Sequence, residues 1–169
     1  NEMSHRLTEL IGNGGFETGV LSPWTVVAGV AAVTTSQKAH SGNFTAIIGP
    51  SSAIQQVISE GLREDRVYRF SGALSDNGSG GIDTPENPTT VVTLQFIDDD
   101  GNVLETFTKT FNALTLPENQ EGNYRVFNLL AESPEDTKGA IVTIVTTADG
   151  VGNNNIVVDD FSLIQENND

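Results

Sequence analysis

The sequence predicts an all-β fold, an antiparallel β-sandwich of the jelly-roll type, and three observations support it. Short runs of β-branched and aromatic residues recur about every ten to fifteen residues, bounded by clusters of Gly, Pro, Asn and Asp. No convincing amphipathic helix interrupts these runs, which excludes a parallel α/β sheet. Between residues 89 and 111, two alternating segments flank an Asp-Gly-Asn turn, and this pattern predicts a hairpin.

The hairpin shows the clearest strand pattern in the chain. Val92, Leu94 and Phe96 alternate with Thr93 and Gln95, which indicates a strand with one buried and one solvated face. The chain then turns and returns along 103–111. The other predicted strands are 24–27, 31–35, 44–48, 53–58, 66–74, 124–130, 140–147 and 156–164.

The length of 169 residues is that of about one domain. We therefore expect a single β-sandwich module over residues 1–169, with 1–9 as a leader and 165–169 as a linker-like tail. The polar, Gly-rich segments 75–88, 117–122 and 148–155 are predicted surface loops. Each is expected to be a solvated connector, although loops of this kind also carry binding residues.

The composition restricts the classes of partner. Eight Lys and Arg against 23 Asp and Glu give a formal net charge of −15, which excludes nucleic acid and anionic membrane surfaces. The chain has no cysteine, so it has neither disulfides nor thiolate metal sites. No apolar run approaches the roughly 18 residues of a transmembrane helix. Carboxylates and Asn residues gather in Gly-rich turns, a setting that suits oxygen-ligand calcium sites.

The sequence offers no recognisable catalytic motif. It contains no G-x-S-x-G elbow and no phosphate-binding glycine loop. The two histidines, His5 and His40, are distant in sequence and do not form a zinc cluster. Pairs of carboxylates at the spacing of a glycosidase are unavoidable in so acidic a chain, so they carry no information. We expect a protein that is not an enzyme.

Five segments together resemble a known family. They are NGGFETGVLSPW at 13–24, HSG at 40–42, VYRFSGAL at 67–74, FIDDDGNVLET at 96–106 and VVDDFSL at 157–163. In this order and spacing they resemble the β-sandwich carbohydrate-binding modules of families 4, 9 and 22. They also resemble the related galactose-binding-like domains of bacterial surface and spore-coat proteins. The likeness covers nearly the whole chain, and it implies the same jelly-roll fold.

The resemblance implies a structural calcium ion. In these modules the glutamate of the first motif and the first aspartate of the last strand commonly lie side by side, and backbone carbonyls complete the shell. By position these residues are Glu17 and Asp159, with a carbonyl from the turn 38–42. His40 would contribute through its backbone.

The residues themselves support a buried carboxylate at Asp159. If Phe161 and Leu163 face the core, a period of two places Asp159 on the same inward face and Asp160 outside. A buried ionised carboxylate needs a cation or several hydrogen bonds, and neither motif has a Lys or Arg close by. The alternative to calcium is that Asp159 accepts backbone N–H groups while Glu17 is exposed.

Sugar recognition commonly uses aromatic rings, and few are available here. Trp24 is expected in the core, which leaves Tyr68 and Tyr124 as polar-tipped aromatics. We predict ligand contacts from five residues: Tyr68, Arg69, Gln95, Tyr124 and Arg125. For Arg69 and Gln95 the alternative is an ordinary solvated position on a strand. The run from Asp98 to Asp100 is either a second calcium site or, as we prefer, a charged hairpin turn.

From these observations we expect a calcium-stabilised binding module of a secreted or cell-surface protein. Its expected partner is a carbohydrate, either an oligosaccharide or a polysaccharide, and its expected location is extracellular or at the cell surface. We also expect it to be a monomeric part of a larger chain. The alternative function is an adhesion, peptide-binding or spacer module of a large bacterial surface protein.

Overall fold

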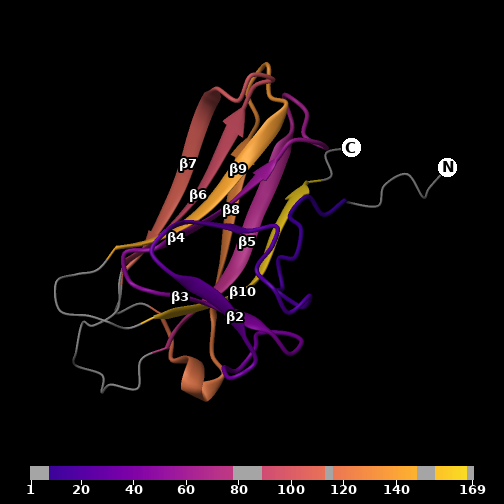
Figure 1. Cartoon of the computed structure of the whole chain (residues 1–169). Helices are drawn as coiled ribbons and strands as arrows, with labels where there is room; N and C mark the ends of the chain where they lie inside the picture. Colours follow the sequence, from indigo (N-terminus) through magenta and orange to yellow (C-terminus); the bar gives the residue numbers. More distant parts are fainter. Residues whose placement is uncertain (1–7, 78–88, 113–115, 148–154, 167–169) are drawn as a thin grey trace.

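The computed structural model describes residues 8–77, 89–112, 116–147 and 155–166, which form two antiparallel five-stranded sheets packed face to face (Figure 1). Sheet I has the strand order β1 (Thr25–Ala28), β4 (Ala53–Ile58), β9 (Gly139–Thr147), β6 (Thr89–Ile97) and β7 (Val103–Phe111). Sheet II has the order β2 (Ala31–Thr34), β3 (Thr45–Ile48), β10 (Ile156–Gln165), β5 (Val67–Asp76) and β8 (Arg125–Glu132). The predicted all-β antiparallel sandwich is therefore confirmed.

All ten predicted strands are present. The bounds of β4 and β7 match the prediction, and the other strands differ from it by up to a few residues at their ends. One short 3-10 helix, η3 (Asn119–Glu121), lies within the predicted loop 117–122 and was not expected. The predicted loops 75–88 and 148–155 fall mainly outside the described residues, except that Ser75 and Asp76 end β5.

Alternation along the strands builds the core between the two sheets. In β6 the side chains of Val92, Leu94 and Phe96 are fully buried, while Thr93 and Gln95 between them are partly exposed. Burial of this apolar face supplies the main stabilisation, because removal of apolar surface from water is the dominant favourable contribution to folding. In the part of the chain that the structure describes, no helix is long and apolar enough to cross a membrane.

The N-terminal segment, residues 8–24, packs along the C-terminal half of β10. Leu10 N donates to Leu163 O at 3.0 Å, and Phe161 N donates to Gly14 O at 2.9 Å. The segment also brings Phe16 and Trp24 into the core, with the Trp24 and Phe161 ring centroids 5.2 Å apart. The expectation that Trp24 belongs to the core is thus confirmed.

The predicted leader and tail were each too long. The carboxylate of Glu9 accepts hydrogen bonds from Ile11 N and Leu163 N, so this residue belongs to the fold. Gln165 ends β10, and Glu166 N donates to Val67 O. Residues 1–7 and 167–169 lie outside the described part of the chain.

Candidate functional site

Three carboxylates, those of Glu17, Asp159 and Asp160, lie where the N-terminal segment, the turn 38–44 and β10 meet. We call them the acidic cluster. The Asp159 side chain is 0% exposed, and its Oδ2 accepts hydrogen bonds from His40 N at 2.9 Å and Ser41 N at 3.2 Å. Its Oδ1 accepts a third, from Asp160 N at 2.8 Å. The exposed Glu17 carboxylate accepts hydrogen bonds from Asn43 N and Phe44 N. The two predicted carboxylates therefore bind successive parts of one turn.

The reason given for the burial of Asp159 was wrong, although the burial itself is observed. A β-bulge interrupts the register of β10 against β5 between Asp159 and Ser162, and Asp160 adopts a left-handed φ of 55°. The bulge shifts the phase of the strand, so that Val158 and Phe161 both face the core. Asp159 is buried because the turn 38–44 covers it, and it does not share the inward face of Phe161.

The electrostatics of the cluster follow from this burial. Loss of solvent raises the pKa of Asp159 to about 6, although three backbone N–H groups hydrogen-bond to its carboxylate. The side chains of His40 and Ser41 hold Asp160, with His40 Nδ1 2.6 Å from Asp160 Oδ2 and Ser41 Oγ 2.8 Å from Oδ1. Among the described residues, no Lys or Arg pairs with Glu17, Asp159 or Asp160.

The acidic cluster offers the type of ligand atom that a hard cation prefers, but its side chains are not arranged as a complete set of metal ligands. Carboxylate oxygens are suitable ligands for calcium, and a cation would compensate the buried charge of Asp159. Within the described residues, however, no three His, Asp or Glu side chains are positioned together as metal ligands. His40 presents its backbone N–H to Asp159, where a carbonyl was expected. The Lys38 carbonyl instead accepts hydrogen bonds from Asn119 Nδ2 and the Tyr124 hydroxyl.

The run Asp98 to Asp100 forms a hairpin turn. Asp98 Oδ1 accepts hydrogen bonds from Asp100 N at 2.9 Å and Asn102 N at 2.8 Å. The Asn102 backbone N–H is the main cause of the lowered pKa of Asp98. The preferred interpretation, a charged turn, accounts for these contacts without a cation.

The five predicted ligand contacts do not form one site. Tyr68 as a ligand contact is wrong, because its side chain is 0% exposed and its hydroxyl accepts a hydrogen bond from Arg63 N at 2.8 Å. Arg69 and Gln95 lie on polar strand faces, as predicted. They belong to β5 and β6, in different sheets, so they point to opposite outer faces of the sandwich. Arg69 is paired with Glu166.

Tyr124 lies near the acidic cluster, and Arg125 follows it as the first residue of β8. The partly exposed Tyr124 ring meets the His40 ring edge-on, with 5.3 Å between centroids. Its hydroxyl donates to the Lys38 carbonyl, and burial raises its pKa to about 12. The Arg125 guanidinium lies over the Phe111 ring, 5.2 Å from its centroid. The Tyr124 hydroxyl therefore has a structural partner already.

Sequence reasoning missed a hollow that contains a partly exposed aromatic ring, which we call the Phe107 hollow. It has a volume of about 290 Å³ and is lined by Asp65, Glu105, Phe107, Glu132, Ser133 and Pro134. Of the chain's eleven aromatic residues, which all lie in the described part, only Phe44, Phe107 and Tyr124 are not buried. An aromatic ring beside three carboxylates matches the apolar and polar faces of a pyranose.

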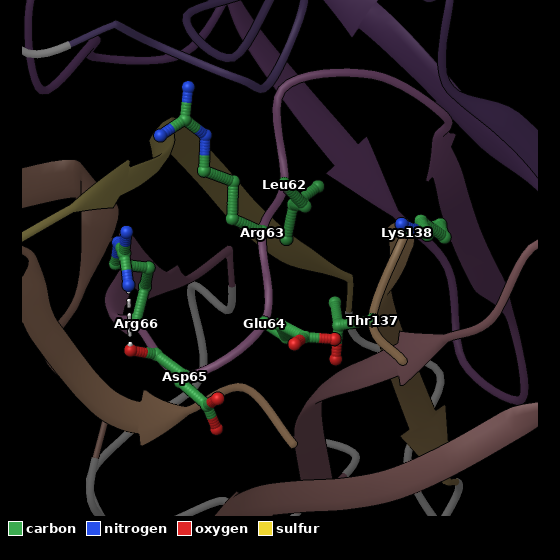
Figure 2. A pocket seen from close by; sticks show the side chains of 7 residues that line it. All are labelled: Leu62, Arg63, Glu64, Asp65, Arg66, Thr137 and Lys138. Carbon is green, nitrogen blue, oxygen red and sulfur yellow. Dashed lines mark hydrogen bonds between the residues drawn. The ribbon is translucent and has the colours of Figure 1, made fainter. Parts of the chain in front are cut away.

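A second hollow adjoins the first through Asp65, and we call it the arginine hollow. It has a volume of about 360 Å³ and is lined by Leu62, Arg63, Glu64, Asp65, Arg66, Thr137 and Lys138. Figure 2 shows side chains from two connections on its wall, 62–66 before β5 and 137–138 before β9. The chain has only eight Lys and Arg residues, and three of them, Arg63, Arg66 and Lys138, lie at or just before the starts of predicted strands. This clustering is the sequence feature that could have pointed to the hollow.

Comparison with known proteins establishes the fold. No family model matches the sequence, and the comparison with curated proteins found no match. The enzymatically active domain of bacteriophage CBA120 tailspike protein 4 superposes with a TM-score of 0.71 at 14% identity. The match covers 94% of this chain, which spans only 21% of the tailspike chain.

Two carbohydrate-binding modules match over nearly their whole length. A family 61 module in complex with β-1,4-galactotriose has a TM-score of 0.62 and 20% identity, with 94% of this chain and 99% of that chain covered. The CBM22-1 xylan-binding domain from Paenibacillus barcinonensis has a TM-score of 0.67 and 15% identity, with 96% and 97% covered. The resemblance seen in the sequence is thus confirmed for the fold, and the chain has the same jelly-roll sandwich fold as these modules.

Proposed function

We propose that this chain is a saccharide-binding module without catalytic activity, and that the sugar binds in the Phe107 hollow. The observation that carries the proposal is the position of Phe107. Its ring is partly exposed, and it lines a hollow together with the carboxylates of Asp65, Glu105 and Glu132. The solved modules with the same fold, one of them bound to β-1,4-galactotriose and another described as xylan-binding, support this choice of ligand class.

The geometry of the hollow suits a pyranose ring. Phe107 pairs with Leu94 of β6, so its side chain points inward from the edge strand β7 and its ring packs against the Phe96 ring. One face of a sugar can contact this ring while its hydroxyls donate hydrogen bonds to the carboxylates. The outer face of sheet I, where Gln95 lies, has no aromatic side chain among its described residues, which makes it the weaker alternative.

Isothermal titration with β-1,4-galactotriose and with soluble xylan fragments tests the proposal. Phe107→Leu keeps most of the apolar volume but removes the ring, and we expect at least a tenfold loss of affinity. Gln95→Ala is the matched control on the outer face of sheet I, and its affinity should equal that of the wild type. A loss confined to Gln95→Ala would move the site to that face. No binding by the wild type would reject the sugar and favour the adhesion or spacer function.

We also propose that Ca²⁺ binds at the acidic cluster and has a structural role. Glu17 and Asp159 would hold the ion together with backbone oxygens of the turn 38–42. It would then connect the N-terminal segment to β10. The support is the buried Asp159 carboxylate, which the described residues leave without a cationic partner. A site with only two carboxylates would bind calcium weakly, which suits the high calcium concentrations outside the cell and a secreted or cell-surface location.

Thermal unfolding in excess CaCl₂, in MgCl₂ and in EDTA tests the calcium proposal. Calcium that binds only the folded chain raises the midpoint by mass action. We expect this rise in the wild type and its loss in Glu17→Ala and in Asp159→Ala. Coincident curves for the wild type in CaCl₂ and EDTA would refute the proposal, and an equal rise with MgCl₂ would show that the effect is not specific to calcium.

A further inference from the structure

The arginine hollow concentrates positive charge in a strongly acidic chain. Three of the eight Lys and Arg residues, Arg63, Arg66 and Lys138, line it, although the net charge of the chain is −15. None of the three forms an ion pair with a described residue. Among the described residues, their charged groups make one hydrogen bond, from Arg66 to the backbone carbonyl of Asp65 at 3.2 Å. Their charges therefore remain available to a ligand.

Buried polar groups hold the two arginines in place. The Ser133 side chain is 1% exposed, and its Oγ accepts a hydrogen bond from Arg66 N at 3.0 Å and donates to Arg63 O at 2.6 Å. The Tyr68 hydroxyl accepts a hydrogen bond from Arg63 N at 2.8 Å. Asp65 N donates to Ser133 O at 2.9 Å. The backbone of 63–66 is thus fixed before any ligand binds, which lowers the entropic cost of binding.

The opposite wall of the hollow is also fixed. The Thr137 side chain is 1% exposed and donates to Pro134 O at 2.7 Å. Lys138 N donates to Ile97 O at 2.8 Å, which anchors this wall to the end of β6. In Figure 2, Thr137 and Lys138 lie to the right of the two arginines, and the Arg63 guanidinium points away from Lys138. A ligand in the hollow therefore meets cationic side chains from two separate connections.

The charges of the hollow select a monoanion. Three cationic side chains are accompanied by the carboxylates of Glu64 and Asp65, so the lining carries one net positive charge. One of these carboxylates is engaged, since Glu64 accepts a hydrogen bond from Asp136 N at 2.9 Å. A single sugar carboxylate matches this balance and can bind a guanidinium in bidentate fashion. A phosphate dianion would leave charge uncompensated beside two carboxylates.

We propose that the arginine hollow binds the carboxylate of a hexuronic acid residue, next to a sugar held in the Phe107 hollow. This inference rests on the proposed saccharide-binding function, and the two hollows adjoin because both are lined by Asp65. The chain would thereby prefer an acidic oligosaccharide over the neutral one of the same linkage. Arg63 and Arg66 on one wall and Lys138 on the other would supply the positive charge for the carboxylate.

The test compares two ligands on three proteins by isothermal titration. The ligands are a glucuronic-acid-containing xylo-oligosaccharide and the same oligosaccharide with the carboxylate reduced to the neutral hydroxymethyl group. The proteins are the wild type, the double variant Arg63→Gln with Lys138→Gln, and Arg125→Gln as a control cation outside both hollows. Arg63 and Lys138 are exposed, so these substitutions should leave the fold intact, which circular dichroism verifies.

We expect the wild type and Arg125→Gln to bind the acidic ligand at least tenfold more tightly than the neutral one in low salt. This preference should disappear in the double variant and shrink in high salt. Equal binding of both ligands by the wild type would overturn the inference and leave the proposed function standing. No binding of either ligand would overturn both. Binding of inorganic phosphate as tight as that of the acidic sugar would show a general anion site and overturn the inference.

Discussion

The buried carboxylate of Asp159 gives the chain a pH-dependent stability, which the substitution Asp159→Asn should remove. The side chain is fully buried, and desolvation raises its pKa from 3.8 to about 6. Asn is nearly isosteric, and its oxygen can still accept the hydrogen bonds from His40 N and Ser41 N. It cannot ionise, so it isolates the titration of this one group from that of the other acids.

The sign and size of the effect follow from the two pKa values. A carboxyl group with a raised pKa in the folded state binds its proton more tightly there, so it stabilises the fold at low pH. This contribution is complete below the unfolded pKa and is lost as the pH rises through the folded pKa. A rise in pKa from 3.8 to about 6 corresponds to about 3 kcal/mol. The wild type should therefore lose about 3 kcal/mol relative to Asp159→Asn between about pH 4 and pH 7.

Urea unfolding at several pH values in EDTA measures this difference. Trp24, the only tryptophan, packs against Phe161 close to the bulge, so its fluorescence reports the folding of this region. The quantity to compare is the difference in the free energy of unfolding between the wild type and Asp159→Asn, because the other carboxylates affect both proteins equally. A difference that is constant over this pH range would refute the assignment of the raised pKa to Asp159. Saturating CaCl₂ should abolish the effect in the wild type if calcium binds, because it favours the ionised form.

Further predictions concern the packing of the backbone and a buried hydroxyl. Gly14→Ala should destabilise the fold by about 2–4 kcal/mol in urea unfolding, because the new Cβ would lie 1.9 Å from Phe161 O. Gly101→Ala is its control: with no atom within 4 Å of its Cβ but a φ of 85°, it should cost only about 1–2 kcal/mol. Tyr68→Phe should lower the free energy of unfolding by about 1–3 kcal/mol, because Arg63 N loses its acceptor. Equal stability of this variant and the wild type would contradict the structural role of the hydroxyl.

The strands could be predicted because alternation is a local property of the sequence. The bulge in β10 could not, since it depends on the register of Asp159 to Ser162 against β5. Local patterns also do not show which strands are neighbours, and this is why the predicted ligand contacts Arg69 and Gln95 proved to lie in different sheets. Alternation placed Arg69 and Gln95 on outer faces, but it does not say which sheet a strand joins. The burial of Tyr68 could have been predicted from the sequence. Tyr68 lies two residues before Phe70 on β5, so both side chains point to the same face, and both are buried.

The two hollows lay beyond sequence reasoning for a topological reason. Val67 pairs with Glu132, so the connection before β5 meets the one after β8, although about 65 residues separate them. The edge strand β7 then brings Phe107 to the same corner through its pairing with β6. The sequence pattern does not reveal this hollow, because alternation along β7 places Phe107 on the face that points to the core. Phe107 borders a hollow only because β7 is the last strand of its sheet.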